Sequence, residues 1–384
     1  MVSAKPPPDL RIPYSTSTVQ ISIIDTTSAV IALPAAYFVE PEIPGFSAVN
    51  APCYGMLIKH QDSTSKKSKY DTLVWDLGVR VDWENSPKSL IDMIKGSGAS
   101  IEVEKDVATI LRENGQNLNE VGGIIWSHHH FDHTGDPTTF PSSTDLIVGP
   151  GFKSAFVPAW PTVPDSGVAE SAYEGRTLRE IDFEAESKGL QIGRYQAIDF
   201  YGDGSFYLLD TPGHAIGHIC ALARTTIDPP TFMFLGGDIA HHGGEFRPTQ
   251  YLPLPDDIKP NPLYPLGSKS APRCPGEIFE ALHPKHVRTE PFMQPKSGES
   301  AHIDGAEAKL QIEKMGEFDG YDSIFPVIAH DQSLYDVVEF YPKSANDWKA
   351  KGWKTEGTWR FLRDFDTGNE EYRPQYELSF PKKA

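Results

Sequence analysis

The sequence predicts an α/β protein, on three observations. A short apolar run at 121–126 is typical of a buried strand, and a dense polar loop follows it directly. A helix is expected at 106–114, between a capping aspartate and a terminating glycine. Turn residues between apolar runs predict two hairpins, at 195–210 and 219–235. Helix, strand and loop thus follow one another as in an α/β unit.

Short apolar runs between turn residues predict the remaining elements. The polar residues 61–69 are typical of a hairpin tip. Pro326 lies within the last expected strand, and its missing N–H favours an edge or bulged position. The expected strands are 19–24, 29–33, 54–60, 70–76 and 323–328, and the expected later helix is 306–315.

The composition narrows the class of partner. The chain has 384 residues, 39% of them hydrophobic, which is enough to bury the core of one large or two ordinary domains. Its 35 Lys and Arg against 53 Asp and Glu give a formal charge of -18. Because this charge repels phosphate backbones and anionic lipid, neither nucleic acid nor a membrane is an expected partner.

The cysteines and the apolar runs indicate where the protein works. Cys53, Cys220 and Cys274 are far apart and match neither a disulfide framework nor a metal-binding spacing. The longest apolar run, 29–39, is interrupted by Pro34 and is shorter than the ~20 residues that span a bilayer. A reducing, cytoplasmic location is therefore expected, without a signal peptide or membrane segment.

Residues 127–136 hold four histidines and two aspartates within ten positions. Imidazole nitrogen and carboxylate oxygen bind divalent metals, and a strand end holds such groups in place. On an extended segment His128, His130 and Asp132 lie on one side, and His133 follows where the chain turns. A surface histidine run would leave the embedded Asp132 and the preceding strand unexplained, so the sequence predicts a metal site.

The motif His128-X-His130-X-Asp132-His133 resembles the signature of the metallo-β-lactamase-fold hydrolases. The resemblance implies an αββα sandwich, in which two mixed β-sheets are flanked by helices, with lid-like insertions. We expect a single domain over residues 1–384. Its parts would be an N-terminal arm at 1–18, insertions near the site at 137–194 and 243–301, and a C-terminal appendage at 336–384.

In that family three later ligands complete a two-metal site, and this chain has a candidate for each. They are His214 in the turn Thr-Pro-Gly-His, Asp238 after a strand, and His330 after the last strand. Two divalent ions are therefore expected, with Zn²⁺ first and Fe or Mn as alternatives, and no other cofactor. The resemblance assigns His128, His130 and His214 to one ion, Asp132, His133 and His330 to the other, and Asp238 to both.

Four further residues lie next to these motifs. Asp76 is expected to support the metal loop by hydrogen bonds, with a simple turn residue as the alternative. His218 is left unassigned to metal, and Asp331 either orients His330 or ends its strand. His241 stands where the similar N-acyl homoserine lactonases place a tyrosine that contacts substrate. We expect it to donate to the developing oxyanion or to orient the leaving group, with a supporting or surface role as the alternative.

The resemblance implies a dinuclear hydrolase, in which metal-bound hydroxide attacks a carbonyl and Asp132 relays a proton to the leaving atom. The chain is similar to lactonases and to fungal lactamases that open small rings such as benzoxazolinone, so opening of a small lactone or lactam is favoured. One alternative is a thioesterase or glyoxalase-II-like hydrolase, for which only residues 283–288 offer a basic docking surface. Another is a metal-binding protein without activity. The expected partner is a small carbonyl compound, and no oligomeric state is indicated.

Overall fold

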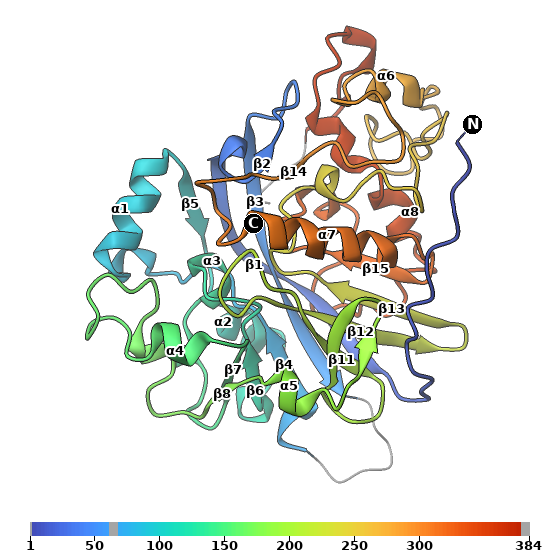
Figure 1. Cartoon of the computed structure of the whole chain (residues 1–384). Coiled ribbons are helices and arrows are strands. Elements are labelled where there is room, and N and C mark those ends of the chain that lie inside the picture. The colour runs from blue at the N-terminus through green and yellow to red at the C-terminus, as the bar shows by residue number, and fades with distance from the viewer. Residues whose placement is uncertain (1, 61–67, 378–384) are drawn as a thin grey trace.

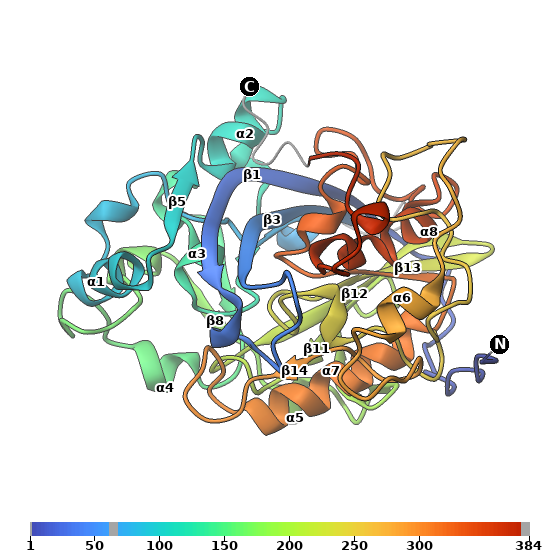
Figure 2. The same ribbon diagram turned by 90° about the horizontal axis from the view of Figure 1, so that it is seen from above.

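Two mixed β-sheets face each other, and helices cover their outer faces (Figure 1). The computed structural model describes residues 2–60 and 68–377, so most of the predicted hairpin tip at 61–69 lies outside the described residues. Seen from above, α1 lies on one side of the molecule and α6 and α8 lie on the other, with the strands between them (Figure 2). The predicted αββα sandwich is confirmed.

The first sheet has seven strands in the order β5-β1-β3-β4-β6-β7-β8. Pairing is antiparallel from β5 to β4 and parallel from β4 to β8. The strands are β5 (Ser100–Val103), β1 (Val19–Pro34), β3 (Ala48–His60), β4 (Thr72–Trp75), β6 (Gly123–Ile125), β7 (Asp145–Val148) and β8 (Leu178–Glu180).

The second sheet has six strands in the order β15-β13-β12-β11-β10-β9. Only the β13–β15 pair is parallel, and β15 lies at the edge, as Pro326 predicts. Its strands are β15 (Ile324–Val327), β13 (Pro230–Leu235), β12 (Ile219–Ile227), β11 (Phe206–Asp210), β10 (Tyr195–Asp199) and β9 (Gln191–Ile192). A separate pair joins β14 (Gln294–Pro295) to β2 (Val39–Glu40).

Eight α-helices are found in the described part of the chain. The longest, α7, has 15 residues, and none of the eight helices is long and apolar enough to cross a membrane. The helices are α1 (Lys88–Ser97), α2 (Val107–Glu113), α3 (Phe131–Thr134), α4 (Phe152–Phe156), α5 (Phe183–Glu186), α6 (Gly276–Glu280), α7 (Gly305–Asp319) and α8 (Trp353–Gly357).

Three apolar layers hold the sandwich together. Side chains such as Ile23 from β1 and Leu208 from β11 fill the space between the sheets. Leu111 of α2 belongs to the layer on the outer face of the first sheet, and Met315 of α7 to the layer on the outer face of the second. Each of these four side chains is fully buried, which favours folding by about 1.5–3 kcal/mol.

The predicted segments differ in how they join the sandwich. Residues 19–24 and 29–33, expected as two strands, form the single strand β1, because pairing with β3 resumes after an irregularity between Asp25 and Ala29. Residues 137–194, expected as an insertion, contribute β7 and β8 to the first sheet. Such short parallel strands are specified by their neighbours more than by their own sequence.

The strand directions bring several loops to one edge. Both β11 and β13 are antiparallel to β12, and β13 is parallel to β15. The C-terminal ends of β11, β13 and β15 therefore lie on the same side of the second sheet. In the first sheet β4 and β6 are parallel and end together. The predicted ligands follow directly after β6, β11, β13 and β15.

A buried ion cluster ties three distant segments together. The guanidinium of Arg247 donates to both carboxylate oxygens of Asp319, at 2.7 and 3.0 Å, and the ammonium of Lys354 lies 3.3 Å away. Burial alone would raise the pKa of Asp319, but the two cations outweigh it and hold that pKa at about 2. An unfolded aspartate has a pKa of about 3.9, so this stabilisation is present at neutral pH and is lost as the pH falls from about 4 towards 2.

We predict that Asp319→Asn lowers the free energy of unfolding by about 3–5 kcal/mol at pH 7, because it leaves two buried cations without a carboxylate. The difference from the unchanged protein should shrink as the pH falls below about 4. Urea denaturation measures both effects. Asp92→Asn is the control, since Asp92 pairs with Lys88 on the exposed surface and should change stability by less than about 1 kcal/mol. Equal losses in the two variants would contradict the prediction.

Candidate metal centre

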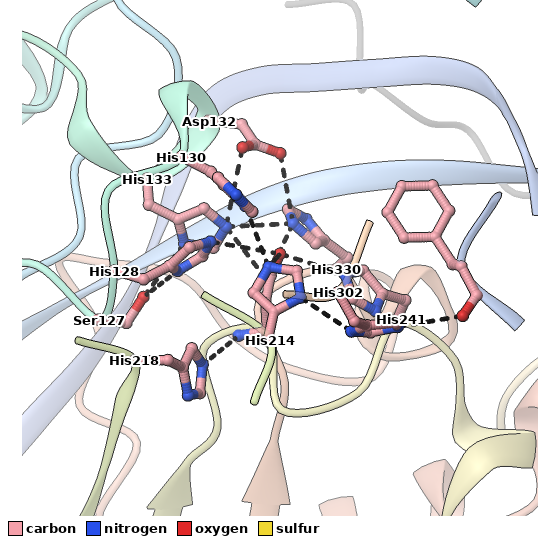
Figure 3. A network of polar contacts seen from close by, with 12 residues as sticks. Ser127, His128, His130, Asp132, His133, His214, His218, His241, His302 and His330 are labelled. Carbon is pink, nitrogen blue, oxygen red and sulfur yellow. Dashed lines mark hydrogen bonds and ion pairs between the residues drawn. The ribbon is translucent and has the colours of Figure 1, made fainter. Parts of the chain in front are cut away.

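The seven predicted ligands meet where the C-terminal ends of β6, β11, β13 and β15 come together. Figure 3 shows the imidazoles of His128, His133, His214 and His330 turned towards one another. All are buried except His130, which is half-buried. The full set is His128, His130, Asp132, His133, His214, Asp238 and His330.

A helical turn places the last two residues of the motif. The extended segment ends at His130, whose carbonyl accepts from the N–H groups of His133 and Thr134 at 3.0 and 3.2 Å as α3 begins. The predicted strand alternation therefore does not reach Asp132. Because a helical turn reverses direction within a few residues, Asp132 and His133 still face the cluster.

A glycine allows His214 to reach the cluster from the turn after β11. Gly213 has a φ of +120°, and a side chain there would collide with the backbone nitrogen of Ala308 at the start of α7. The turn can pack this closely on α7 only with glycine. His214 follows it and points into the site.

Asp238 lies at the centre of the cluster. Its Oδ1 is 3.0 Å from His133 Nε2 and 3.1 Å from His330 Nε2. Its Oδ2 is 3.4 Å from His214 Nε2 and 3.7 Å from His128 Nε2. His241 Nε2 also lies 3.3 Å from Oδ2, so the two oxygens face different sets of imidazoles, which is the arrangement a bridging carboxylate needs.

The potential ligand atoms form two groups that share Asp238. His130 Nδ1 lies 3.0 Å from His214 Nε2, and Asp132 Oδ2 lies 3.4 Å from His330 Nε2. Within each group the atoms lie within 4.8 Å of one another. One group is His128, His130, His214 and Asp238, and the other is His133, His330 and Asp238 with Asp132 beside it.

Asp76 holds the metal loop from behind. Its carboxylate accepts from the backbone N–H and the hydroxyl of Ser127, both at 2.7 Å, and from His133 Nδ1 at 2.9 Å. Because the Ser127 hydroxyl donates to Asp76, its oxygen can accept from His128 Nδ1, 3.1 Å away. These bonds fit the supporting role expected for Asp76. When the two rings are neutral, the bonds place the proton on Nδ1 and leave the lone pair of Nε2 facing Asp238.

Another histidine is oriented by a backbone group. His330 Nδ1 donates to the carbonyl of Pro52 at 2.6 Å, so in the neutral ring Nε2 also carries a lone pair towards Asp238. Asp331 does not orient His330 through its side chain, because that carboxylate caps the following turn at the N–H of Ser333. Fixing the Nδ1 proton in this way is how proteins usually orient a histidine that binds metal.

These residues fit a divalent cation. Within the described chain, His128 Nε2 is buried without a hydrogen-bond partner, and Asp238 Oδ1 is buried with only the imidazoles of His133 and His330 beside it. Burial would raise the pKa of Asp238, but His133 and His330 outweigh it and hold that pKa well below its usual range. Burial would likewise lower the pKa of His133, and Asp238 and Asp76 raise it instead. The cluster therefore favours positive charge at its centre, which a metal ion supplies.

The two histidines that the sequence left without a metal role differ in their contacts. His218 accepts from the backbone N–H of Asp238 at 3.1 Å and donates to the carbonyl of Thr211 at 2.9 Å, so it holds the backbone at the site. His241 is 3% exposed, its Nε2 lies 3.3 Å from Asp238 Oδ2, and neither ring nitrogen has a hydrogen-bond partner in the described chain. Glu245 fixes it by accepting from its backbone N–H at 2.6 Å.

Two residues beside the cluster were missed by sequence reasoning. Cys53 lies within reach of Asp132 and His330. His302, the residue that follows the insertion 243–301, contacts His214. Burial and then the charge of His241 lower the pKa of His302 to about 4. Neither residue belongs to a motif, because the fold brings each to the site from far away in the sequence.

A cavity of about 700 Å³ opens onto the cluster. Asp132, His130, His241 and other residues of the metal centre form its floor, and α1 with the segment before β2 forms apolar walls. Among the described residues, no lysine or arginine lines it. The cavity therefore suits an uncharged, mainly apolar molecule.

The basic segment 283–288 does not face this cavity. Arg288 is paired with Asp256 at 2.5 Å and with Glu280 at 2.6 Å, and Lys285 is paired with Glu290 at 2.6 Å. Cations that are already paired and lie outside the cavity do not provide the docking surface that a coenzyme A or glutathione thioester would need.

The chain is similar in sequence to fungal hydrolases over nearly its whole length. It is 56% identical to a gamma-lactamase of Fusarium pseudograminearum over 371 residues, which cover 97% of this chain and 88% of that protein. It is 59% identical to a gamma-lactamase of Gibberella moniliformis over 243 residues, 63% of this chain and 100% of that protein. It is 42% identical to a metallo-hydrolase of Annulohypoxylon moriforme over 94% of this chain and 91% of that protein. No family model matches the chain.

Solved structures share the fold. A quorum-quenching N-acyl homoserine lactone hydrolase superposes with a TM-score of 0.51 and 15% identity, over 86% of this chain and 99% of its own. A B. thuringiensis protein with N-decanoyl-L-homoserine bound at its active site gives the same TM-score and identity, over 85% and 99%. The metallo-β-lactamase fold, which the histidine motif predicts, is confirmed.

We predict that Asp76→Asn lowers the affinity for divalent metal about 10–100-fold, because it removes the charge that faces His133. Asp76 has a φ of +51°, a conformation that asparagine also adopts, so the variant tests charge rather than backbone strain. Chelator competition measures the affinity. Asp82→Asn, at an exposed site paired with Arg80, is the control. Unchanged affinity in Asp76→Asn would refute this role.

Proposed function

This chain belongs to the family of the fungal gamma-lactamases and metallo-hydrolases, and on that premise we propose that it opens a small cyclic amide or ester. The observation that carries the proposal is the cluster of seven candidate ligands onto which an apolar cavity opens. A neutral lactam or lactone fits a cavity without cationic side chains, whereas a substrate with a charged carrier does not. The relatives' names support a lactam first.

We propose that the site holds two divalent ions, with zinc as the expected metal. The two groups of ligand atoms, each facing one oxygen of Asp238, support this number. Imidazole and carboxylate ligands suit zinc, with iron or manganese as alternatives. When bound, such ions supply a water of lowered pKa and polarise a carbonyl.

We propose that Asp132 moves a proton. Its carboxylate lies 3.4 Å from His330 Nε2 and also lines the cavity, so it faces both the metal centre and the substrate. A carboxylate there can take a proton from the attacking water and deliver it to the nitrogen or oxygen that leaves the ring.

We propose that His241 binds the reacting group. Its buried ring lines the cavity, and within the described residues its nitrogens have no hydrogen-bond partner. A buried polar group without a partner costs free energy, so it favours a ligand that supplies one. We propose that His241 donates to the carbonyl oxygen as negative charge develops there.

The proposal is tested with a lactam, a lactone and a thioester of similar size, each uncharged, with metal content measured in parallel. We expect ring opening to be fastest for the lactam or the lactone, to stop when a chelator removes the metal, and to return on adding Zn²⁺. Faster hydrolysis of the thioester, or activity that survives metal removal, would overturn the proposal.

Asp132→Asn is expected to lower kcat/KM about 10²–10⁴-fold and to weaken metal retention, because the amide can neither accept a proton nor balance the charge of a metal. Asp136→Asn is a matched control from the same motif, since Asp136 caps the next turn outside the cluster and asparagine can also cap. Full activity of Asp132→Asn would exclude the assigned role.

His241→Ala is expected to lower kcat about 10²–10³-fold while the metal content stays unchanged. The neighbouring His242→Ala is the control, because His242 packs against Phe46 and does not line the cavity. Turnover equal to that of the unchanged protein would show that His241 takes no part in the reaction, and loss of metal would show that it is a ligand.

A further inference from the structure

We propose that His302 is a positioning residue for the metal centre: it fixes the proton of His214 and so tightens the hold of that ligand on a divalent ion. This inference rests on the proposed function, because it assumes that His214 binds metal. His302 directly follows the insertion 243–301, lies outside every motif of the sequence, and is 6% exposed.

The contacts form a chain of three groups. His214 Nδ1 lies 3.2 Å from His302 Nδ1, and His302 Nε2 lies 3.1 Å from the carbonyl oxygen of Phe38 (Figure 3). On its other side, His214 Nε2 faces Asp238 Oδ2 at 3.4 Å. This series of contacts thus links the backbone of Phe38, just before β2, to Asp238 at the centre of the cluster.

Only one arrangement of protons satisfies these contacts when both rings are neutral. A carbonyl oxygen can only accept, so His302 Nε2 must carry the proton that is donated to Phe38. A neutral His302 then has a lone pair at Nδ1, and His214 Nδ1 must donate to it. This leaves the lone pair of His214 on Nε2, the atom that faces Asp238. His302 does for His214 what Asp76 does for His133.

The backbone around His302 holds it in register with His214. The N–H of Ile303 donates to the carbonyl of His214 at 3.0 Å, and the N–H of Asp304 donates to the carbonyl of Gly213 at 2.8 Å. On the other side, the N–H of Ala301 donates to the carbonyl of Tyr37 at 3.1 Å. The ring is therefore held between two segments and is not free to turn away, as an orienting partner requires.

The same link joins the metal centre to the cavity wall. Phe38 accepts from His302 through its backbone, while its ring packs on His241 at 4.5 Å between centroids. Tyr37, Phe38 and Ala301 all line the cavity. Two consecutive residues thus serve both purposes: Ala301 forms part of the cavity wall, and His302 is the partner of His214.

The test compares two variants of His302. His302→Asn keeps one acceptor and one donor, whereas His302→Leu keeps bulk without either. The metal-free proteins are titrated with Zn²⁺ against a chelator and with Co²⁺ by visible absorption. We expect His302→Leu to bind metal about 10–100-fold more weakly and to change the cobalt spectrum, and His302→Asn to recover most of the affinity.

His283→Leu is the matched control. His283 is a buried histidine of the insertion 243–301 that contacts the carbonyls of Glu290 and Pro291, far from any ligand in the sequence. Its variant should lose stability on heating without a change in metal affinity. Thermal unfolding of each metal-free variant separates a loss of folding from a loss of orientation.

The outcomes separate the two proposals. If the unchanged protein takes up no divalent metal, the proposed function and this inference both fail. If it binds metal and His302→Leu binds equally tightly, only the role of His302 fails. That role also fails if both variants lose one whole ion while the affinity for the other ion is unchanged. His302 would then be a metal ligand itself, together with the nearby His214 and His241.

Discussion

A buried carboxylate in the middle of five imidazoles is the constraint on which the site depends. Asp238 is almost without contact with water, and an isolated charge there would cost several kcal/mol. The fold offsets this cost by surrounding both oxygens with histidine nitrogens from two sheets. Because Nδ1 of His128, His133 and His330 is tied to other groups, the Nε2 lone pairs of the neutral rings face inward, and the side chains are oriented before any ion binds.

The parts of the fold and site that the sequence predicted are those with short-range signals. The histidine motif lies within six residues, so its chemistry is readable without a structure. Helix α2 has its cap and its stop glycine in the sequence, and Pro326 marks an edge strand. The distant ligands His214, Asp238 and His330 were predicted by resemblance, and whether they bind metal stays a prediction.

The parts that could not be predicted depend on contacts across long stretches of chain. Strands β7 and β8 have four and three residues, and their place is decided by the pairing of β7 with β6 and of β8 with β7 rather than by their own pattern. The three bonds of Asp76 and the contact of His302 with His214 join residues 51 to 88 positions apart. The sequence predicts two strands where the structure has the single strand β1, because the polar residues at the irregularity between Asp25 and Ala29 hide the continued pairing with β3.

Helix α1 has a consequence for how such enzymes diversify. Only Ile94 of this helix is buried, yet Leu90, Met93 and Ser97 also line the cavity, and Met93 is 53% exposed. Exchanging a half-exposed side chain usually changes the folding free energy by only a few tenths of a kcal/mol. Under the proposed function, the wall that faces the substrate can therefore drift over evolutionary time while the proposed metal-binding floor stays fixed, so new ring systems become accessible without rebuilding the enzyme.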